Sequence, residues 1–164
     1  MDHVQYMERI REYYLSQGYD KPYAWPHFAN VPFTPLKKPL SDSTVTLLST
    51  SDVSVRREEG DTLSPAETTV GDVYSVSWDT PVEKLYSRQE SFDRHATSLD
   101  DINAYLPLTR LREFVAEGRI GAVTPNFHNI NRGYSQRLMM ETAAPAALAK
   151  CREEGADVAI LTPI

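Results

Sequence analysis

The chain has 164 residues, of which 41% are hydrophobic and 24% charged, and its net charge is −6. This length predicts one domain, and the composition is that of a globular protein with its own core. The acidic balance argues against a nucleic-acid partner, because phosphate binding needs clustered Lys and Arg. No stretch approaches the roughly 20 apolar residues of a membrane span. A single cysteine, Cys151, rules out an internal disulfide and favours a reducing, cytoplasmic location.

The first 40 residues differ in composition from the rest. An apolar stripe at helical spacing predicts a helix over residues 3–17 that ends at Gly18. The stripe consists of Val4, Met7, Ile10 and Tyr14. Residues 19–40 carry five prolines and five aromatic residues, which exclude a helix or a central strand. We therefore expect a helix and an extended Pro/aromatic arm at 1–40, followed by an α/β domain at 41–164.

Strand signals begin after the arm. Residues 44–50 (TVTLLST) are β-branched and apolar and predict a first buried strand. The polar segment SDVSVRREEGD at 51–61 is expected to be a loop. Apolar residues alternate within 68–80 and predict a second strand, whereas 81–101 lack periodicity. The alternating residues are Val73, Val76 and Trp78.

Helices and strands alternate in the last third of the chain. A helix at 107–117 is predicted by Pro107 in its first turn and by Gly118 as its stop. Its apolar face consists of Leu108, Leu111, Phe114 and Val115. Short strands follow at 120–124 and 157–162. This alternation predicts crossover units and a three-layer α/β fold with a mostly parallel, Rossmann-like sheet.

A second helical region is expected between Ser135 and Glu154, and it contains Pro145. Two arrangements are open. Either the helix kinks at the proline, or a new helix spans 143–154 with Thr142 as its N-cap.

His95 lies in the polar segment SFDRHATSLDDIN, close to Asp101 and Asn103. A histidine beside carboxylates is suited to general acid–base catalysis or metal binding. The competing interpretation is a solvated loop in which Asp and Asn cap the helix that follows. The length of this polar loop favours a functional role.

His128 lies in TPNFHNINRGYS, after the predicted strand at 120–124. Ligands of open α/β sheets bind beyond the carboxyl ends of the strands. His128, Asn126 and Arg132 are therefore candidates to bind a substrate carboxylate, although a turn-rich connection without function would look the same. The chain has no GxGxxG segment and hence no sign of a dinucleotide loop. Cys151 shares a helical face with alanines and Leu148, which is typical of a small buried hydrophobe.

Three segments carry a family resemblance. The central one, at 101–121, combines an Asp-x-Asn pair, a proline, an Arg-Leu-Arg-Glu run and a Glu-Gly-x-Ile-Gly turn. Its matching residues are Asp101, Asn103, Pro107, Arg110, Leu111, Arg112, Glu113, Glu117, Gly118, Ile120 and Gly121. The others are TVTLLSTSDV at 44–53 and ETAAPAALAKCREEGADVAILTP at 141–163. Together they resemble the selenoprotein B family of glycine, sarcosine, betaine and D-proline reductases.

The resemblance implies an oxidoreductase that cleaves a C–N bond in a small amino-acid-derived substrate. In that family a redox segment, selenocysteine or cysteine followed by Pro and Cys, comes straight after the final strand. The nucleophile is therefore expected just after Ile164, where a UGA codon taken for a stop would interrupt the chain. The resemblance also implies a pyruvoyl-bearing partner subunit, a thiol reductant and an oligomer. The catalytic candidates are His95 and His128, and the substrate-binding candidates are Asp101, Asn103, Asn126 and Arg132.

Without that nucleophile the chain alone is expected to be inactive. The alternative is a non-catalytic binding or partner subunit that uses the Pro/aromatic arm as its interface. Recruitment of the same fold to another pathway is a further possibility. No metal ligands are expected.

Overall fold

The computed structural model describes residues 5–22, 24–56, 68–90, 92, 94–95 and 98–164. The chain divides into two compact units, Met1–Thr34 and Pro35–Ile164. The first unit contains helix α1 (Tyr6–Ser16), none of whose residues is buried, and residues 24–34, which form neither helix nor strand. The helix ends at Ser16, and Gly18 follows its C-cap with a φ of +85°, the left-handed conformation expected after a helix. The predicted N-terminal helix is therefore confirmed within the described residues.

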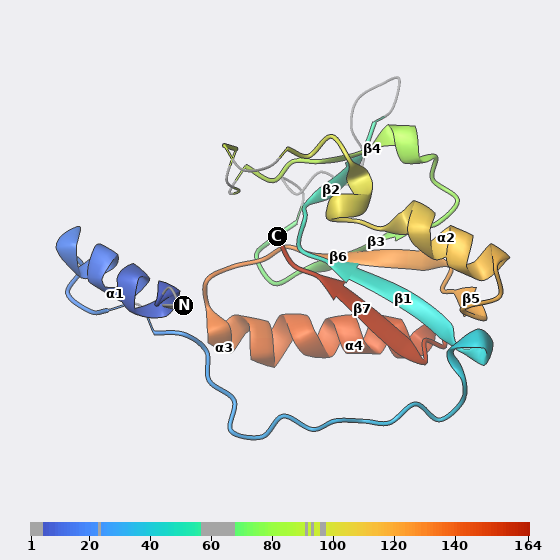
Figure 1. Ribbon diagram of the computed structural model, residues 1–164, viewed down its shortest axis with the longest axis horizontal. Coiled ribbons are helices and arrows are strands. Elements are labelled where there is room, and N and C mark those ends of the chain that lie inside the picture. The colour runs from blue at the N-terminus through green and yellow to red at the C-terminus, as the bar shows by residue number, and fades with distance from the viewer. Residues whose placement is uncertain (1–4, 23, 57–67, 91, 93, 96–97) are drawn as a thin grey trace. The chain divides into compact units, whose positions relative to one another are not determined.

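The second unit is built on a mostly parallel sheet (Figure 1). Its central strand β1 (Thr44–Ser49) pairs in parallel with β7 (Val158–Thr162) on one side. On the other side it pairs in parallel with β5 (Ala122–Val123) and then with β6 (Asn126–Ile130). Strand β3 (Val73–Ser77) is antiparallel to β6 and forms an edge. The predicted mixed α/β class with a mostly parallel sheet is confirmed.

Two helices pack against β1 through alternate residues. Helix α2 (Leu108–Ala116) contributes Leu108 and Leu111 to the buried cluster that contains Val45 and Leu47. Helix α4 (Ala144–Glu153) contributes Ala147 and Cys151 to a second buried cluster that contains Leu48. Alternate strand residues point to opposite faces, so the two helices cover opposite faces of the sheet. Full burial of each large aliphatic side chain stabilises the fold by about 1.5–3 kcal/mol.

A small second sheet corrects the loop predicted at 51–61. Strand β2 (Val53–Val55) pairs antiparallel with β4 (Leu85–Ser87), and Val53 and Leu85 are buried. The Tyr74 hydroxyl donates a hydrogen bond to the Val53 carbonyl at 3.0 Å. The loop prediction was wrong here because a strand of three residues is too short to show a clear period. Residues 57–67 of that predicted loop lie outside the described residues.

The strand predicted at 120–124 forms only in part, and a second strand follows it. Only Ala122–Val123 form a strand at that position, and β6 resumes at Asn126 after Pro125. Proline has no N–H and interrupts the ladder, while the Thr124 hydroxyl donates to the Asn126 carbonyl at 2.7 Å across the break. The competing interpretation of the segment TPNFHNINRGYS as a turn-rich connection is therefore wrong for Asn126–Ile130, which form β6. Its polar side chains made a buried strand look like a loop.

The helical region near Pro145 follows neither predicted arrangement fully. It begins at α3 (Gln136–Leu138), where the Ser135 hydroxyl accepts a hydrogen bond from the Leu138 amide. A wider π turn at Met139–Ala143 follows, and α4 continues with Pro145 in its first turn. In Figure 1 these segments lie end to end as one helical column. Thr142 does not cap α4, because the π turn joins it directly to the preceding helix.

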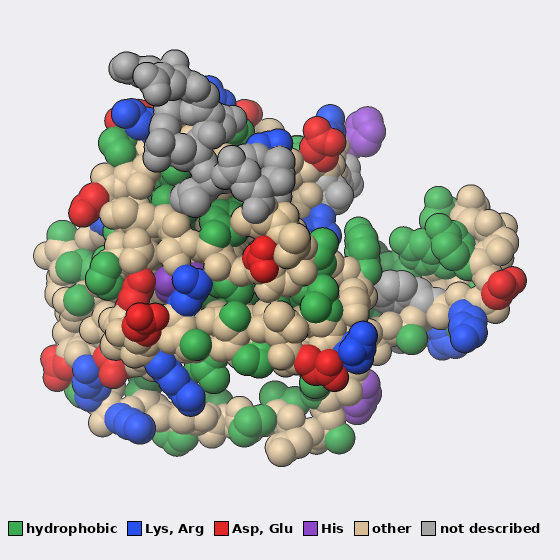
Figure 2. Space-filling view, turned by 180° about the vertical axis from the view of Figure 1, so that it is seen from behind, with side chains coloured by type: hydrophobic (Ala, Val, Ile, Leu, Met, Phe, Trp, Pro, Cys, Tyr) green, Lys and Arg blue, Asp and Glu red, His purple; other side chains and the backbone are tan. Residues whose placement is uncertain are grey.

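Surface charge is spread rather than gathered. Over the face shown in Figure 2, the Lys and Arg side chains are scattered among Asp and Glu. In the part of the chain that the structure describes, every helix is too short or too polar to cross a lipid bilayer.

Candidate functional site

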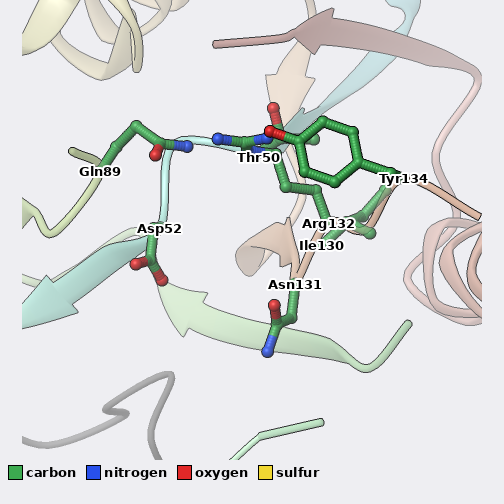
Figure 3. Close-up of a pocket in the computed structure, with 7 residues that line it drawn as sticks. All are labelled: Thr50, Asp52, Gln89, Ile130, Asn131, Arg132 and Tyr134. Carbon is green, nitrogen blue, oxygen red and sulfur yellow. The ribbon is translucent and has the colours of Figure 1, made fainter. Parts of the chain in front are cut away.

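A pocket of about 260 Å³ opens beyond the carboxyl ends of β1 and β6 (Figure 3). Its lining residues are Thr50, Asp52, Gln89, Ile130, Asn131, Arg132 and Tyr134. This is the edge at which parallel α/β sheets bind ligands. The volume is below the usual range of drug-sized sites and suits a small metabolite.

Asp52 occupies a strained turn between β1 and β2. Its φ of +55° lies in the left-handed region, which Asp tolerates better than most residues and which is frequent at functional sites. The Arg88 amide donates to the Asp52 carbonyl at 3.0 Å and fixes this turn. Burial raises the pKa of the Asp52 carboxyl, while the positive charges of Arg88 and Arg132 act to lower it. The carboxyl group is thus partly desolvated beside two cations.

Arg132 follows β6 directly and lies in the same pocket as Asp52. Its guanidinium carbon is 5.9 Å from the centre of the Tyr134 ring. Among the residues that the structure describes, neither Asp52 nor Arg132 takes part in an ion pair. The pocket therefore offers an anion and a cation that do not neutralise each other by direct contact.

The wall of the pocket next to Arg132 is held in place by Asn131. The Asn131 side-chain amide donates to the Thr68 hydroxyl at 2.8 Å and to the Thr68 carbonyl at 3.2 Å. The Asn131 carbonyl also accepts a hydrogen bond from the Gly71 amide at 2.8 Å. These bonds fix the backbone from which Arg132 projects.

Residues 162–164 run beside the pocket and are bound to Thr50, one of its lining residues. The Ile164 amide donates to the Thr50 hydroxyl at 3.0 Å, and the Thr50 amide donates to the Thr162 carbonyl at 3.4 Å. The Ser49 hydroxyl donates to the same Thr162 carbonyl at 3.2 Å. The segment after β7 is therefore attached to the pocket edge through β1.

Of the predicted site residues, Arg132 lines this pocket and His128 does not. The His128 side chain is fully buried within β6, on the face that α4 covers. Its Nδ1 is 3.0 Å from the Ser75 hydroxyl, and its Nε2 is 3.7 Å from a Glu154 carboxylate oxygen. Burial lowers the pKa of His128, Glu154 acts to raise it, and Lys150 acts to lower it. A role for His128 in catalysis stays a prediction, and this ring has no contact with the pocket.

The other predicted residues also lie away from the pocket lining. His95 is exposed in a turn. Asp101 accepts a hydrogen bond from the Asn103 amide at 2.9 Å and caps the short helix Ile102–Ala104. Asn103 in turn accepts from the Thr109 hydroxyl at 2.6 Å. These contacts agree with the competing interpretation of this segment, in which Asp and Asn side chains cap helical turns.

Asn126 lies at the opposite, amino end of β6. Its side-chain amide donates to Glu154 at 2.6 Å, which ties β6 to the end of α4. The structure therefore groups Arg132 with Thr50, Asp52, Gln89 and Tyr134, which the sequence did not single out. A signal for Thr50 and Asp52 was present, because Thr50 ends the first predicted strand and Asp52 follows it closely, at the edge where a parallel sheet binds ligands.

Within the described ranges, no group of three or more His, Cys, Asp or Glu side chains could hold a metal ion. Comparison with known proteins finds no matching family model, no matching curated protein and no matching solved structure.

Proposed function

We propose that the chain is a selenoprotein B-type reductase subunit that takes part in C–N bond cleavage of a small amino-acid-derived substrate. The observation that carries the proposal is the attachment of residues 162–164 to Thr50, at the edge of the pocket that contains Asp52 and Arg132. The family resemblance expects a redox segment directly after the strand that β7 forms. A residue following Ile164 would then start beside the pocket.

The pocket residues suit such a substrate. A guanidinium group binds a carboxylate through two parallel hydrogen bonds, and Arg132 is free of ion pairs with the described residues. A selenocysteine or cysteine after Ile164 would supply a nucleophile of low pKa, and a pyruvoyl group on a partner subunit would activate the substrate. Arg132 and Asp52 would bind and orient the substrate for that chemistry.

The outer edge of β7 is unpaired among the described strands. Among the described strands, β7 pairs with β1 alone, and Leu161 of β7 is 68% exposed. Leu148 on α4 is also 49% exposed. Proteins rarely leave an apolar strand edge unprotected. We propose that this unit is a three-layer, Rossmann-like domain whose β7 edge is covered in the assembled protein. A cytoplasmic location and an oligomeric state belong to the same proposal.

A second candidate is a non-catalytic partner subunit. The first unit favours it, because α1 and the following arm expose large apolar side chains. These include Tyr6, Tyr13, Phe28, Val31 and Phe33. Exposed aromatic residues are enriched where proteins bind one another.

The nucleotide sequence after the Ile164 codon discriminates between the two candidates. A UGA codon followed by an open frame that encodes Pro and Cys supports the reductase. A UAA or UAG codon supports the partner subunit and contradicts the reductase.

A further inference from the structure

Strand β7 has an open side at the edge of the main sheet (Figure 1), since among the described strands it pairs with β1 alone. The Asp157 amide donates a hydrogen bond to the Thr44 carbonyl of β1 at 2.9 Å. Backbone N–H and C=O groups alternate in direction along a strand. Those of Val158 and Ile160 therefore point away from β1, where a further strand can bond to them.

The face of β7 on the α4 side is apolar and uncovered. Val158 and Ile160 pack against the buried cluster on the α2 side, so Ala159 and Leu161 point to the α4 side. Both are exposed, and so is Leu148 of α4. An open strand edge beside exposed apolar side chains is typical of a surface that binds another chain.

Charge distinguishes this edge from the β3 edge. Strand β3 has an acidic residue at each end, Asp72 and Asp79, so two copies of it would bring like charges together. Strand β7 (VAILT) has no charged residue. The carboxylate of Asp157, just before β7, forms an ion pair with Lys38 at 2.7 Å. The β7 edge therefore carries no charge that opposes pairing with an identical edge.

Two copies of β7 fit each other when they run antiparallel about a twofold axis. Pairing of all five residues puts Ile160 opposite Ile160 of the second copy, and the outward backbone groups of Ile160 then bond to each other. On the α4 side, the small Ala159 of each copy lies opposite the large Leu161 of the other. Apolar cross-strand pairs of this kind are the unit of stabilisation in a sheet.

We infer that β7 binds β7 of a second copy of this chain and joins the two main sheets into one continuous sheet. Such an interface uses the same surface on both copies and closes at a dimer. The inference rests on the proposed function in one respect, that the β7 edge is covered in the assembled protein, and it names the partner. In this register Asp157 of each copy lies opposite Pro163 of the other. The Lys38–Asp157 ion pair of one copy therefore lies next to the segment that borders the pocket of the other.

Sedimentation equilibrium of the 164-residue chain tests the inference. We expect a species of twice the 18.5 kDa mass of the chain at protein concentrations up to about 100 μM. Leu161→Lys places a charge on the edge and should weaken dimerisation at least about tenfold. Val70→Lys is the matched control, because Val70 is also apolar and exposed but lies in the turn before β3. It should dimerise like the native chain.

Disulfide cross-linking tests the register. Directly opposite residues of antiparallel strands are close enough for a disulfide, so an equimolar mixture of Ala159→Cys and Leu161→Cys chains should form a cross-linked dimer with oxidised glutathione. Either variant alone should cross-link much more slowly, because its two cysteines are then offset by two residues. The native chain is the control, since its one cysteine, Cys151, is buried.

A native chain that is monomeric throughout this concentration range would overturn the inference and assign the edge to a different partner. A dimer that Leu161→Lys leaves intact, with no cross-link in the mixture, would also overturn it. These outcomes do not depend on reductase turnover. A β7 dimer whose complete enzyme has no turnover would contradict the proposed function alone, and turnover by a monomer would contradict the inference alone.

Discussion

The Ile164 amide nitrogen lies 3.0 Å from the hydroxyl oxygen of Thr50, which also lines the pocket. One hydroxyl group thus joins the segment after β7 to the candidate substrate site. The two residues are 114 positions apart in the chain, so the parallel pairing of β1 with β7 is what brings them together.

Replacement of Thr50 by valine should release the Ile164 amide. A net hydrogen bond contributes about 0.5–1.5 kcal/mol, so the exchange of this amide with deuterium should quicken up to roughly tenfold. Hydrogen exchange measured by NMR is the readout, and Thr50→Ser, which keeps the hydroxyl, is the control. Equal protection of Ile164 in the valine variant and the native chain would show that this bond does not hold the segment.

Gly121 is expected to tolerate no side chain. A Cβ atom there would lie 2.9 Å from the Ser41 carbonyl oxygen and 3.0 Å from the Ser43 amide nitrogen. Both are backbone atoms that cannot rotate away, so Gly121→Ala should lower the free energy of unfolding by about 1–3 kcal/mol. Chemical denaturation measures the loss. The exposed neighbour offers a control, Ala122→Ser, which should change little, and a fully stable Gly121→Ala would refute the close approach.

The buried His128 should make stability depend on pH. Its folded-state pKa is lowered from the ordinary value of 6.5, chiefly by burial. The unfolded chain therefore takes up the proton first as the pH falls. The stabilisation is complete above about pH 6.5 and is lost as the pH drops from there towards the folded pKa, with a slope of at most about 1.4 kcal/mol per pH unit.

Denaturation at several pH values between about 5 and 8 measures this slope. The variant His128→Gln should flatten it, whereas His27→Gln should leave it unchanged because His27 is exposed. A slope that survives in His128→Gln would assign the pH dependence to another group.

Cys151 should react slowly with thiol reagents. It is buried beside Leu48 and Ala147, and burial raises the pKa of its thiol. Only the thiolate is nucleophilic, so labelling by a disulfide reagent at neutral pH should be slow in the native chain and fast in denaturant. Rapid labelling of the native protein would contradict a structural role.

The helices and strands with a clear pattern of apolar residues or clear end signals were predictable from the sequence. The β-branched run of β1, the Pro-to-Gly frame of α2 and the final strand β7 all lie where the pattern predicted them. Strand β6 was missed because it is rich in polar residues, some of which have partners distant in sequence. His128 contacts Ser75, and Asn126 contacts Glu154, and neither contact can be inferred from the local pattern.

The candidate site was predictable only in part. Its position at the carboxyl edge of the sheet and the participation of Arg132 follow from the order of strands and helices. Gln89 lines the pocket and follows β4 closely in the chain. Strand β4 has only three residues, so no apolar period in the sequence predicts its pairing with β2. Asp52 was not predicted because it lies in a polar turn. Its backbone has a left-handed conformation that Asp adopts without any special sequence requirement, so the sequence gives no sign of it.

The most direct test of the central claim is reductase turnover by two forms of the chain. One is the 164-residue form, and the other carries selenocysteine or cysteine directly after Ile164, followed by Pro and Cys. Each is combined with a pyruvoyl-bearing partner subunit and dithiothreitol and assayed with glycine and D-proline. Reductive C–N cleavage needs a sulfur or selenium nucleophile and a neighbour that resolves it, and the one cysteine of the shorter form, Cys151, is buried. The account predicts turnover by the longer form alone, and turnover by the 164-residue form would contradict it.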